Sequence, residues 1–544
     1  MNCIAIIPVR GGSRGIPRKN ARILYGKPLL AYTIETALNA ETINKVYVST
    51  DDAELAEIAR RYGAHVLERP VALAADQIGL DSVMVDAVRQ LENNGEVIDY
   101  LISIQATSPL LRSETINRAV RKCVEEKLDT VLSVVNDTHL NWQLNAEGNL
   151  IPMHKERVNR QYLSQVFRET GGVVVARRST LNNGSRFGQR VGFIELEKAE
   201  ALDIDDRFDW WTVEKSLVRR RICFYVIGNI QDGLGHVNRA LTLADRLIDH
   251  DLLFIVNEEA ELARKLIEQR FYRLCVVKKG EEVEGIIKEK PDLLVNDILD
   301  TSEEYMLKLR KLPGLVIVNF EDLGPGSRYA DFVVNEMYNH HAIDDRKILQ
   351  GIAYCCLRDE FYSVDPIRIK TEVKNVLLAF GGTDPHNLTM VCLKWLDKVP
   401  SKYKITVILG FGYPYREMVE EYCKTSIHDI EIVVNSAIVS RYMANADLAI
   451  SSAGRTVFEL SSLGIPIIVI AQNERELMHA FARESTGVVN LGLATKLPEQ
   501  VFYDTLKQLL DSPVLRTKMH EVLLAADIRS GINRVLKVIA EVLK

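Results

Sequence analysis

The sequence predicts an α/β protein built from parallel sheets that helices cover on both faces. Short apolar segments alternate with helical segments from the first residues onward, which is the pattern of strands joined by crossover helices. The alternation starts again after the basic run at 219–221, and a chain of 544 residues exceeds what one hydrophobic core accommodates. We therefore expect several α/β units in this chain.

The first unit is expected to contain five strands and four helices. The predicted strands span residues 3–9, 45–49, 65–67, 100–105 and 130–135, and the predicted helices span 28–39, 53–62, 81–93 and 114–126. Because a helix follows nearly every strand, the strands are expected to run parallel in one sheet.

The second half divides again. After the basic run, which is interpreted as a solvated helix end, a strand is expected at 222–227 and a helix at 237–249. Further strands at 375–379 and 448–451 follow a loop-rich stretch that ends near Pro366. The predicted domains therefore span 1–218, 221–366 and 367–544, and the last two are expected to face each other across a cleft.

Composition excludes several classes of protein. The net charge of -6 argues against a general nucleic-acid binder, so basic residues should serve local sites. No apolar run reaches the roughly 18 residues of a membrane span. The 8 cysteines form no Cys-x-x-Cys pair and no Cys/His cluster. They are expected to be reduced, which indicates a cytoplasmic protein. From the net charge and the lack of a long apolar run, we expect it to bind neither nucleic acid nor membrane.

The loop after the first strand carries the strongest functional signal. Residues 6–20 contain three glycines (Gly11, Gly12 and Gly15) and four cations (Arg10, Arg14, Arg18 and Lys19), together with Ser13. Glycines let backbone N–H groups approach a ligand, and fixed cations replace the water around phosphate oxygens. The loop is neither a Walker A sequence nor a Gly-x-Gly-x-x-Gly fingerprint. We expect it to bind a polyphosphate, with a solvated basic turn as the alternative.

Other polar residues follow later strands and should join this site. Gln105, Thr107 and Ser108 can hydrogen-bond a base or a sugar. Asp203 and Asp205 alternate by two, so in an extended segment they share one face. Two carboxylates on one face suit Mg²⁺, and the alternative is that they cap the helix before Trp210.

Residues 1 to about 216 resemble the CMP-sialic acid synthetases, or acylneuraminate cytidylyltransferases. The resemblance rests on the segments IPVRGGSRGIPRKN, GKPLLAYTIETAL, VYVSTDDAELAEIA, ERPVALAAD, QATSPLLR and DIDDRFDW, which occur in order. It implies a Rossmann-like nucleotidyltransferase sheet, and a dimer formed through this domain. It also implies transfer of CMP from CTP to the 2-hydroxyl of a nonulosonic acid, with release of pyrophosphate. The positions implied are Arg10, Gly11, Gly12, Ser13, Lys19, Asn20 and Arg69 at the nucleotide, Gln105, Thr107 and Ser108 at the sugar, and Asp203 and Asp205 at Mg²⁺.

Two departures from that family bear on the sugar. Thr170 stands where the family often has Asn, and 77–80 replaces a serine-rich segment. The Thr170 departure makes legionaminic, pseudaminic or a deaminated acid at least as good a candidate as N-acetylneuraminate. The alternative substrate is 3-deoxy-manno-octulosonate.

The second half offers three glycine-containing loops after strands. Gly233 and Gly235 precede His236 at a helix start, Gly381 and Gly382 follow the strand at 375–379, and Gly454 precedes a helix that carries Glu459. Loops of this kind favour a diphosphate, and Glu459 is placed to bind ribose hydroxyls. The alternatives are a local packing role for His236 and a solvated surface role for Glu459.

Residues from about 221 to 544 resemble the UDP-sugar hydrolase of pseudaminic acid biosynthesis, a relative of GT-B glycosyltransferases. The segments that carry this resemblance are GLGHVNRALTLA, FGGTDPHNLT and AGRTVFELSSLGIP. It implies a two-lobed GT-B-like module that releases UDP from a UDP-amino-sugar, with His236 as base or orienting group. The family's Asp-x-Tyr element corresponds here to Asn296-Asp297-Ile298, without tyrosine, and Asp322 is a weaker acidic match. A glycosyltransferase and a non-catalytic nucleotide-sugar-binding module therefore remain alternatives.

Overall fold

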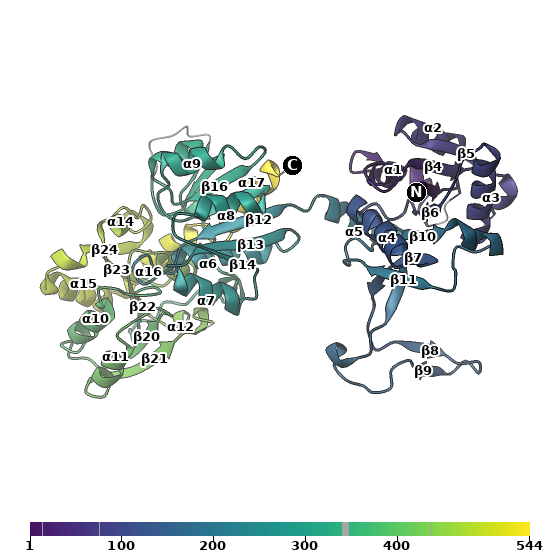
Figure 1. The fold of residues 1–544 in the computed structure, drawn as a ribbon. Helices are drawn as coiled ribbons and strands as arrows, with labels where there is room; N and C mark the ends of the chain where they lie inside the picture. The colour runs from purple at the N-terminus through teal and green to yellow at the C-terminus, as the bar shows by residue number, and fades with distance from the viewer. Residues whose placement is uncertain (13–14, 76, 340–346, 437, 544) are drawn as a thin grey trace. The chain divides into compact units, whose positions relative to one another are not determined.

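The computed structural model describes residues 1–12, 15–75, 77–339, 347–436 and 438–543. Its contacts divide the chain into two compact units, Met1–Arg219 and Arg220–Lys544 (Figure 1). Among the described residues, every helix is too short or too polar to cross a bilayer. All 8 cysteines of the chain are free thiols.

The first unit contains a seven-stranded sheet in the order β11-β7-β10-β6-β1-β4-β5. Its strands are β1 (Cys3–Pro8), β4 (Lys45–Thr50), β5 (His65–Glu68), β6 (Tyr100–Ser103), β7 (Thr130–Asn136), β10 (Phe167–Arg177) and β11 (Val191–Glu195). Its helices are α1 (Leu29–Leu38), α2 (Ala53–Arg61), α3 (Leu80–Asn93), α4 (Ser113–Glu125) and α5 (Arg207–Leu217). The two-residue strands β2 (Ile23–Leu24) and β3 (Lys27–Pro28) pair with each other beside α1.

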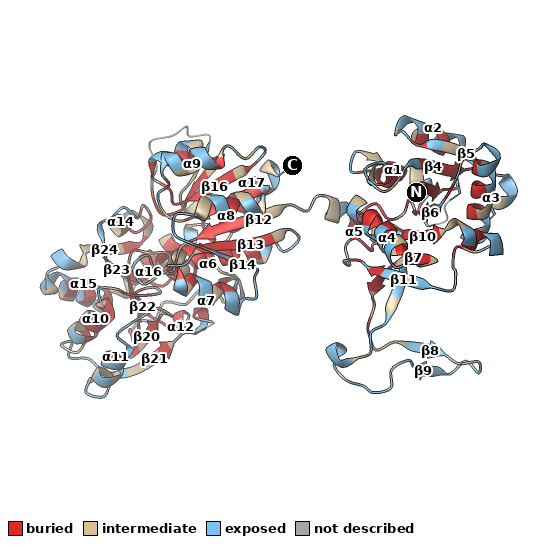
Figure 2. Ribbon diagram, viewed as in Figure 1, coloured by how far each residue is buried: buried red, intermediate tan, exposed pale blue. Residues whose placement is uncertain are grey.

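Helices cover both faces of this sheet, as the alternating pattern predicts. Successive residues of β1 point to opposite faces, so Ala5 and Ile7 pack with α1, α2 and α4, whereas Ile4 and Ile6 pack with α3. The inner strands β1, β4, β6 and β7 are accordingly buried along most of their length, whereas the edge strands β5 and β11 are mostly exposed or half-buried (Figure 2).

The expectation of a wholly parallel sheet is wrong for one strand. β10 pairs antiparallel with β6 and with β7, whereas the other neighbouring strands pair parallel. In the described segment 137–166, no α-helix joins β7 to β10, and the one short helix there is the 3-10 turn Arg160–Tyr162. Instead the chain leaves the sheet through the hairpin of β8 (Trp142–Leu144) and β9 (Leu150–Pro152) and returns in the opposite direction.

The second unit contains two wholly parallel sheets. The first has the order β14-β13-β12-β15-β16-β17-β18 and the second has the order β21-β20-β19-β22-β23-β24. The strands of the first sheet are β12 (Arg221–Val226), β13 (Asp251–Asn257), β14 (Leu274–Val277), β15 (Leu293–Asp297), β16 (Val316–Phe320), β17 (Phe332–Asn335) and β18 (Ile348–Gln350). Those of the second are β19 (Asn375–Ala379), β20 (Lys404–Leu409), β21 (Asp429–Val434), β22 (Leu448–Ser451), β23 (Ile467–Ala471) and β24 (Val488–Leu493).

Helices cover both of these sheets. The helices that accompany the first sheet are α6 (Gly235–Arg246), α7 (Glu261–Gln269), α8 (Glu282–Glu289) and α9 (Glu303–Leu309). The helices that come after β19 in the sequence are α10 (Leu388–Leu396), α11 (Arg416–Cys423), α12 (Ser440–Met443), α13 (Thr456–Ser462), α14 (Glu474–Leu477), α15 (Glu499–Asp511), α16 (Pro513–Ala525) and α17 (Gly531–Val542). The final helix α17 returns to the first sheet, where Ile532, Val535 and Ile539 join its core.

Candidate active sites

A cavity of about 430 Å³ lies in the first unit where β1, β5 and β6 end. This is the edge at which open parallel sheets hold ligands. Predicted site residues that line it are Arg10, Gly12, Lys19, Asn20, Arg69, Gln105, Thr107 and Asp205. Apolar lining comes mainly from Leu73 in the ERPVALAAD segment, from Ile78 and Leu80 in the 77–80 departure, and from Val83, which no motif singled out.

Two glycines of the basic loop sit where no side chain fits. A Cβ on Gly11 would lie 2.4 Å from Oδ2 of Asp52, and one on Gly15 would lie 2.2 Å from the backbone oxygen of Asp205. The loop is thereby pressed against the end of β4 and against the segment before α5. Ser13, predicted to contact phosphate, lies outside the described residues.

The cavity favours an anionic ligand. Among the described residues, its lining carries the cations Arg10, Lys19 and Arg69 and one carboxylate, that of Asp205. Lys19 Nζ lies 3.6 Å from Oδ1 of Asp205 and also donates to the backbone oxygen of Ile204. Arg69 is 8% exposed and donates from Nη2 to the backbone oxygen of Ser49 at 2.6 Å. Burial lowers the pKa of Arg69, but an arginine remains a cation at neutral pH.

Neither Asp203 nor Asp205 is the N-cap of α5. Asp206 is the cap: its Oδ1 accepts from the N–H groups of Phe208 at 2.7 Å and Asp209 at 3.0 Å. Asp205 is therefore available at the cavity, and Oδ1 of Asp203 is buried without a hydrogen-bond partner. Burial, reinforced by the charge of Asp205, raises the pKa of Asp203, while the Thr107 hydroxyl and Lys19 oppose the shift.

A divalent cation fits this arrangement. It would satisfy the unpartnered oxygen of Asp203 and relieve its repulsion with Asp205, and carboxylate with phosphate oxygens is the hard donor set that such cations take. The described residues contain no cluster of three or more His, Cys, Asp or Glu side chains suited to a metal. The remaining ligands would thus have to come from the nucleotide and water.

The predicted sugar-side residues separate into two groups. Gln105 and Thr107 line the cavity, and the Gln105 side chain lies so close to Gly171 that a Cβ there would be 2.5 Å from Oε1. Ser108 and Thr170 are buried in the protein and are absent from the lining. The Thr170 hydroxyl lies 2.7 Å from the hydroxyl of Ser133, so it bonds within the sheet.

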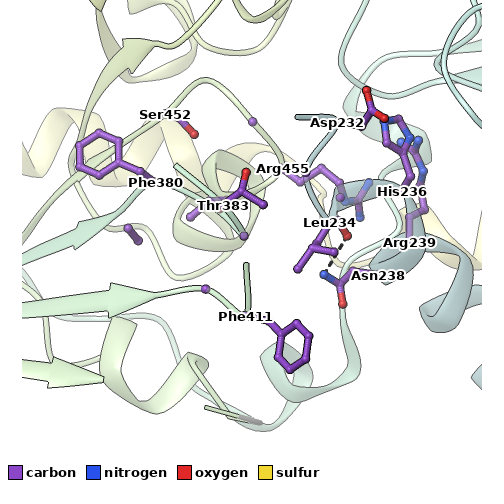
Figure 3. A pocket seen from close by; sticks show the side chains of 18 of the residues that line it. Asp232, Leu234, His236, Asn238, Arg239, Phe380, Thr383, Phe411, Ser452 and Arg455 are labelled. Carbon is purple, nitrogen blue, oxygen red and sulfur yellow. Dashed lines mark hydrogen bonds between the residues drawn. The ribbon is translucent and has the colours of Figure 1, made fainter. Parts of the chain in front are cut away.

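A larger cavity, of about 810 Å³, lies in the second unit between the carboxyl ends of its two sheets (Figure 3). The predicted residues Gly233, Gly235, His236, Gly381, Gly382, Gly454 and Glu459 all line it. Gly233 and Gly381 have φ values of +76° and +85°, a conformation that glycine adopts readily. Three loops far apart in sequence therefore converge on one site.

His236 is held by a buried carboxylate. It is 8% exposed at the start of α6, and its Nδ1 lies 2.6 Å from Oδ1 of Asp297 at the end of β15. Burial opposes ionisation of Asp297, but Arg239 and His236 outweigh it and hold the pKa of that carboxyl below its usual range. Because Asp297 is ionised, Nδ1 donates the hydrogen bond and Nε2 of a neutral imidazole is left as acceptor.

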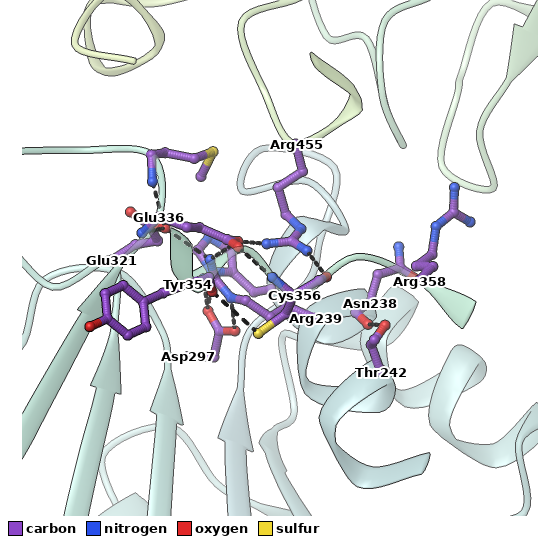
Figure 4. A network of polar contacts seen from close by, with 12 residues as sticks. Asn238, Arg239, Thr242, Asp297, Glu321, Glu336, Tyr354, Cys356, Arg358 and Arg455 are labelled. Atoms are coloured by element: carbon purple, nitrogen blue, oxygen red, sulfur yellow. Dashed lines mark hydrogen bonds and ion pairs between the residues drawn. The ribbon is translucent and has the colours of Figure 1, made fainter. Parts of the chain in front are cut away.

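Asp297, the hydrogen-bond partner of His236, belongs to a buried network of charged side chains (Figure 4). Arg239 donates from Nε and Nη2 to Asp297 at 2.7 and 2.6 Å, and from Nη1 to Glu336 at 2.7 Å and Glu321 at 3.0 Å. All four side chains have no exposed surface. Arg455, just before α13, contacts the Glu336 carboxylate through Nη1 and donates from Nη2 to the backbone oxygen of Cys356 at 2.6 Å.

Three further acidic positions have different roles. Glu459 lines the cavity and accepts from Arg358 Nε at 2.8 Å, so the predicted contact with ribose would have to share that carboxylate with Arg358. Asp322 accepts from Thr301, Asn319 and Gly324 and is absent from the lining. Glu476 lines the cavity, and burial raises its pKa to about 7 although two backbone N–H groups bond its Oε2. No sequence pattern pointed to Glu476.

No tyrosine follows β15 in the loop where the resembling hydrolases carry one. Leu299 occupies that part of the cavity wall, with φ of +68°. A phenol nevertheless lines the cavity from another strand: Tyr338, after β17, lies under the Arg475 guanidinium at 4.9 Å from its ring centroid.

Comparison with known proteins matches each unit to a different family. Residues 4–207 match the family described as Cytidylyltransferase, and residues 376–534 match the Glycosyltransferase family 28 C-terminal domain. N-acylneuraminate cytidylyltransferase A of Danio rerio is 32% identical over 40% of this chain, which spans half (50%) of that protein's length. CMP-N,N'-diacetyllegionaminic acid synthase of Legionella pneumophila is 29% identical over 40% of this chain and 96% of its own length.

One relative spans both units. The Helicobacter pylori protein named pseudaminic acid cytidylyltransferase and UDP-2,4-diacetamido-2,4,6-trideoxy-beta-L-altropyranose hydrolase is 24% identical over 90% of this chain and 92% of its own length. The order of the two units is therefore the same in both proteins. The chain carries an N-terminal cytidylyltransferase domain followed by a domain of the glycosyltransferase family 28 C-terminal kind.

Proposed function

We propose that this chain is a bifunctional enzyme of nonulosonic acid biosynthesis. Residues 1–218 transfer CMP from CTP to the 2-hydroxyl of a nonulosonic acid and release pyrophosphate. Residues 221–366 and 367–544 form the two lobes of a module that hydrolyses a UDP-amino-sugar. The observation that carries the proposal is the two-unit relative aligned over 90% of the chain, together with a cationic cavity in one unit and a His–Asp pair in the other.

In the first unit the chain's own residues bind and neutralise the triphosphate. Arg10, Lys19 and Arg69 offer positive charge to the phosphates, and Asp203 and Asp205 would hold Mg²⁺. When bound, the cation supplies charge neutralisation at the phosphorus and assists ionisation of the sugar hydroxyl. Positioning of the acid against the α-phosphate provides much of the remaining rate, since this class of transfer needs little covalent chemistry from the protein.

In the second unit His236 acts as the base. Asp297 holds Nδ1–H, so Nε2 can accept a proton from water as the water oxygen attacks the anomeric carbon and UDP departs with the bond electrons. Glu459 and the glycine loops hold the nucleotide. The family 28 match favours one alternative, transfer of the sugar to an acceptor other than water.

A substrate panel tests both halves. Pyrophosphate release is measured from CTP and Mg²⁺ with neuraminic, deaminated, legionaminic and pseudaminic acids, and with 3-deoxy-manno-octulosonate. Turnover with one nonulosonic acid supports the first activity and indicates which UDP-amino-sugar to offer the second unit. Release of UDP in water alone supports hydrolysis, whereas release only with an added acceptor supports a glycosyltransferase.

We further propose that the enzyme is a cytoplasmic homodimer joined through the N-terminal domain. The β8–β9 hairpin and its flanks expose the large apolar side chains Trp142, Leu144, Leu150, Met153 and Tyr162. Exposed apolar patches of this kind mark interaction surfaces. Sedimentation velocity of the full chain should give a dimer, and Leu144→Glu with Leu150→Glu should give a folded monomer; a monomeric wild type contradicts the proposal.

A further inference from the structure

The charge network behind His236 crosses from one half of the second unit to the other. Asp297, Glu321 and Glu336 each stand at the carboxyl end of a strand of the first sheet, and Arg239 on α6 joins all three. Arg455 belongs to the loop between β22 and α13, on the second sheet. Figure 3 shows its side chain extending toward Arg239 and His236.

The contacts form an unbroken chain of charges. Arg455 contacts Glu336, Glu336 accepts from Arg239, Arg239 pairs with Asp297, and Asp297 accepts from His236. Arg455 also lines the cavity, beside the Gly454 loop assigned to the diphosphate, whereas Glu336 is fully buried and is absent from the lining. A ligand in the cavity can therefore contact Arg455 at one end of this series of ion pairs, while the imidazole of His236 lies at the other end.

We propose that Glu336 and Arg455 are positioning residues that couple the nucleotide-binding loop to His236 and set the charge felt by its imidazole. The inference rests on the proposed hydrolysis only for its kinetic consequences. Glu336 accepts a hydrogen bond from Arg239 and so keeps Arg239 in place beside Asp297. The positive charge of Arg455 balances the negative charge of Glu336. Neither residue is assigned to the chemistry itself.

The sign of each residue's influence follows from its charge. Besides Asp297 and Arg239, the charged groups near His236 belong to two sets. Glu321, Glu336 and Arg455 belong to the network, and the same cavity is also lined by Asp232, Arg270, Arg358, Glu459, Arg475 and Glu476. Removing the negative charge of Glu336 removes an attraction that stabilises the imidazolium form of His236. Removing the positive charge of Arg455 has the opposite effect.

The direct experiment titrates His236 in the full chain by NMR with labelled histidine, with the signal assigned from His236→Gln. The variants are Glu336→Gln, which keeps the hydrogen-bonding shape, and Arg455→Met. Glu360→Gln is the matched control, because Glu360 pairs with Arg358 at 3.0 Å and contacts neither Arg239 nor Arg455. We expect a downward shift for Glu336→Gln, an upward shift for Arg455→Met and none for the control.

Kinetics provide the second readout. With the UDP-sugar identified by the panel above, Glu336→Gln should lower kcat at least tenfold and leave KM and UDP affinity unchanged, because Glu336 touches no ligand. Arg455→Met should also raise KM. A His236 titration that Glu336→Gln and Arg455→Met leave unmoved overturns the coupling. Absence of any UDP-sugar turnover by wild type would instead count against the proposed function, and the NMR titration still decides the coupling.

If Glu336→Gln fails to fold, Arg455→Met carries the test alone. Arg455 is partly exposed, with 14% of its side-chain surface accessible, so its loss is the milder change. An unshifted His236 in folded Arg455→Met refutes the proposal.

Discussion

Replacing Asp203 with asparagine should make the first unit more stable and much less active. Oδ1 of Asp203 is buried and unpartnered, and burial together with Asp205 raises the pKa of this carboxyl. An unsatisfied buried polar group of this kind costs about 1–3 kcal/mol, and the neutral amide removes the ionic part of that cost. For a unit of this size, a gain of about 1–2 kcal/mol raises Tm by roughly 2–8 °C.

The pH dependence of that gain follows from linkage. Because the folded-state pKa of Asp203 lies above its unfolded value, the wild-type unit loses stability as pH rises through the interval between the two values. The advantage of Asp203→Asn is therefore full at neutral pH and absent below the unfolded pKa, near 4. Calorimetry in EDTA measures it, using the transition that CTP raises to identify the first unit.

Activity should change in the opposite direction. Loss of a cation ligand removes several kcal/mol of transition-state stabilisation, which is a fall of at least about 10²-fold in pyrophosphate release. Asp206→Asn makes the same charge change three residues later and retains an N-cap oxygen, so its stability and turnover should stay near wild type. A less stable Asp203→Asn in EDTA, or one with near-normal turnover, would refute the reasoning.

Three further predictions concern other contacts. Gly15→Ala places a Cβ 2.2 Å from the backbone oxygen of Asp205 and should lower CMP transfer at least tenfold. The control is Gly79→Ala, which should leave CMP transfer unchanged because Gly79 has φ of -68° and open space around its Cβ position. Steady-state assays of pyrophosphate release compare the two variants. Asp297→Asn should lower UDP-sugar hydrolysis by roughly 10²-fold or more and leave CMP transfer unchanged, since it loses the ionised partner of the catalytic imidazole; equal loss of both activities would indicate global damage. Burial raises the pKa of Glu476 to about 7, so the second unit should lose stability as pH rises through 7. In Glu476→Gln, the melting temperature of the second unit should depend less on pH. A pH dependence of the melting temperature equal to that of wild type would contradict this prediction.

Local signals in the sequence were sufficient for most of the fold. Apolar runs separated by helical segments predict β1, β4 and β5 and the helices between them, because each crossover is completed within a few dozen residues. The antiparallel direction of β10 could not be read in this way. It depends on an excursion through the β8–β9 hairpin and on pairing with β6 and β7, which are remote in sequence.

The second site illustrates how much depends on strand order. In the sequence, Asp297 marks a departure from the Asp-x-Tyr element of the resembling hydrolases, because no tyrosine follows it. In the sheet, β15 lies directly beside β12, and the helix after β12 carries His236 in its first turn, so the carboxylate and the imidazole meet. Arg239 is one helical turn from His236 and therefore faces the same strands.

The same geometry explains why three buried acids share one arginine. β15, β16 and β17 are consecutive neighbours in a parallel sheet, so Asp297 at the end of the first, and Glu321 and Glu336 just after the others, reach one edge. Three carboxylates around one guanidinium leave excess negative charge, and burying uncompensated charge is costly. Arg455, arriving from the other half of the unit, offsets that excess. The balance therefore depends on both halves, which is why we assign the coupling of nucleotide loop and imidazole to this contact.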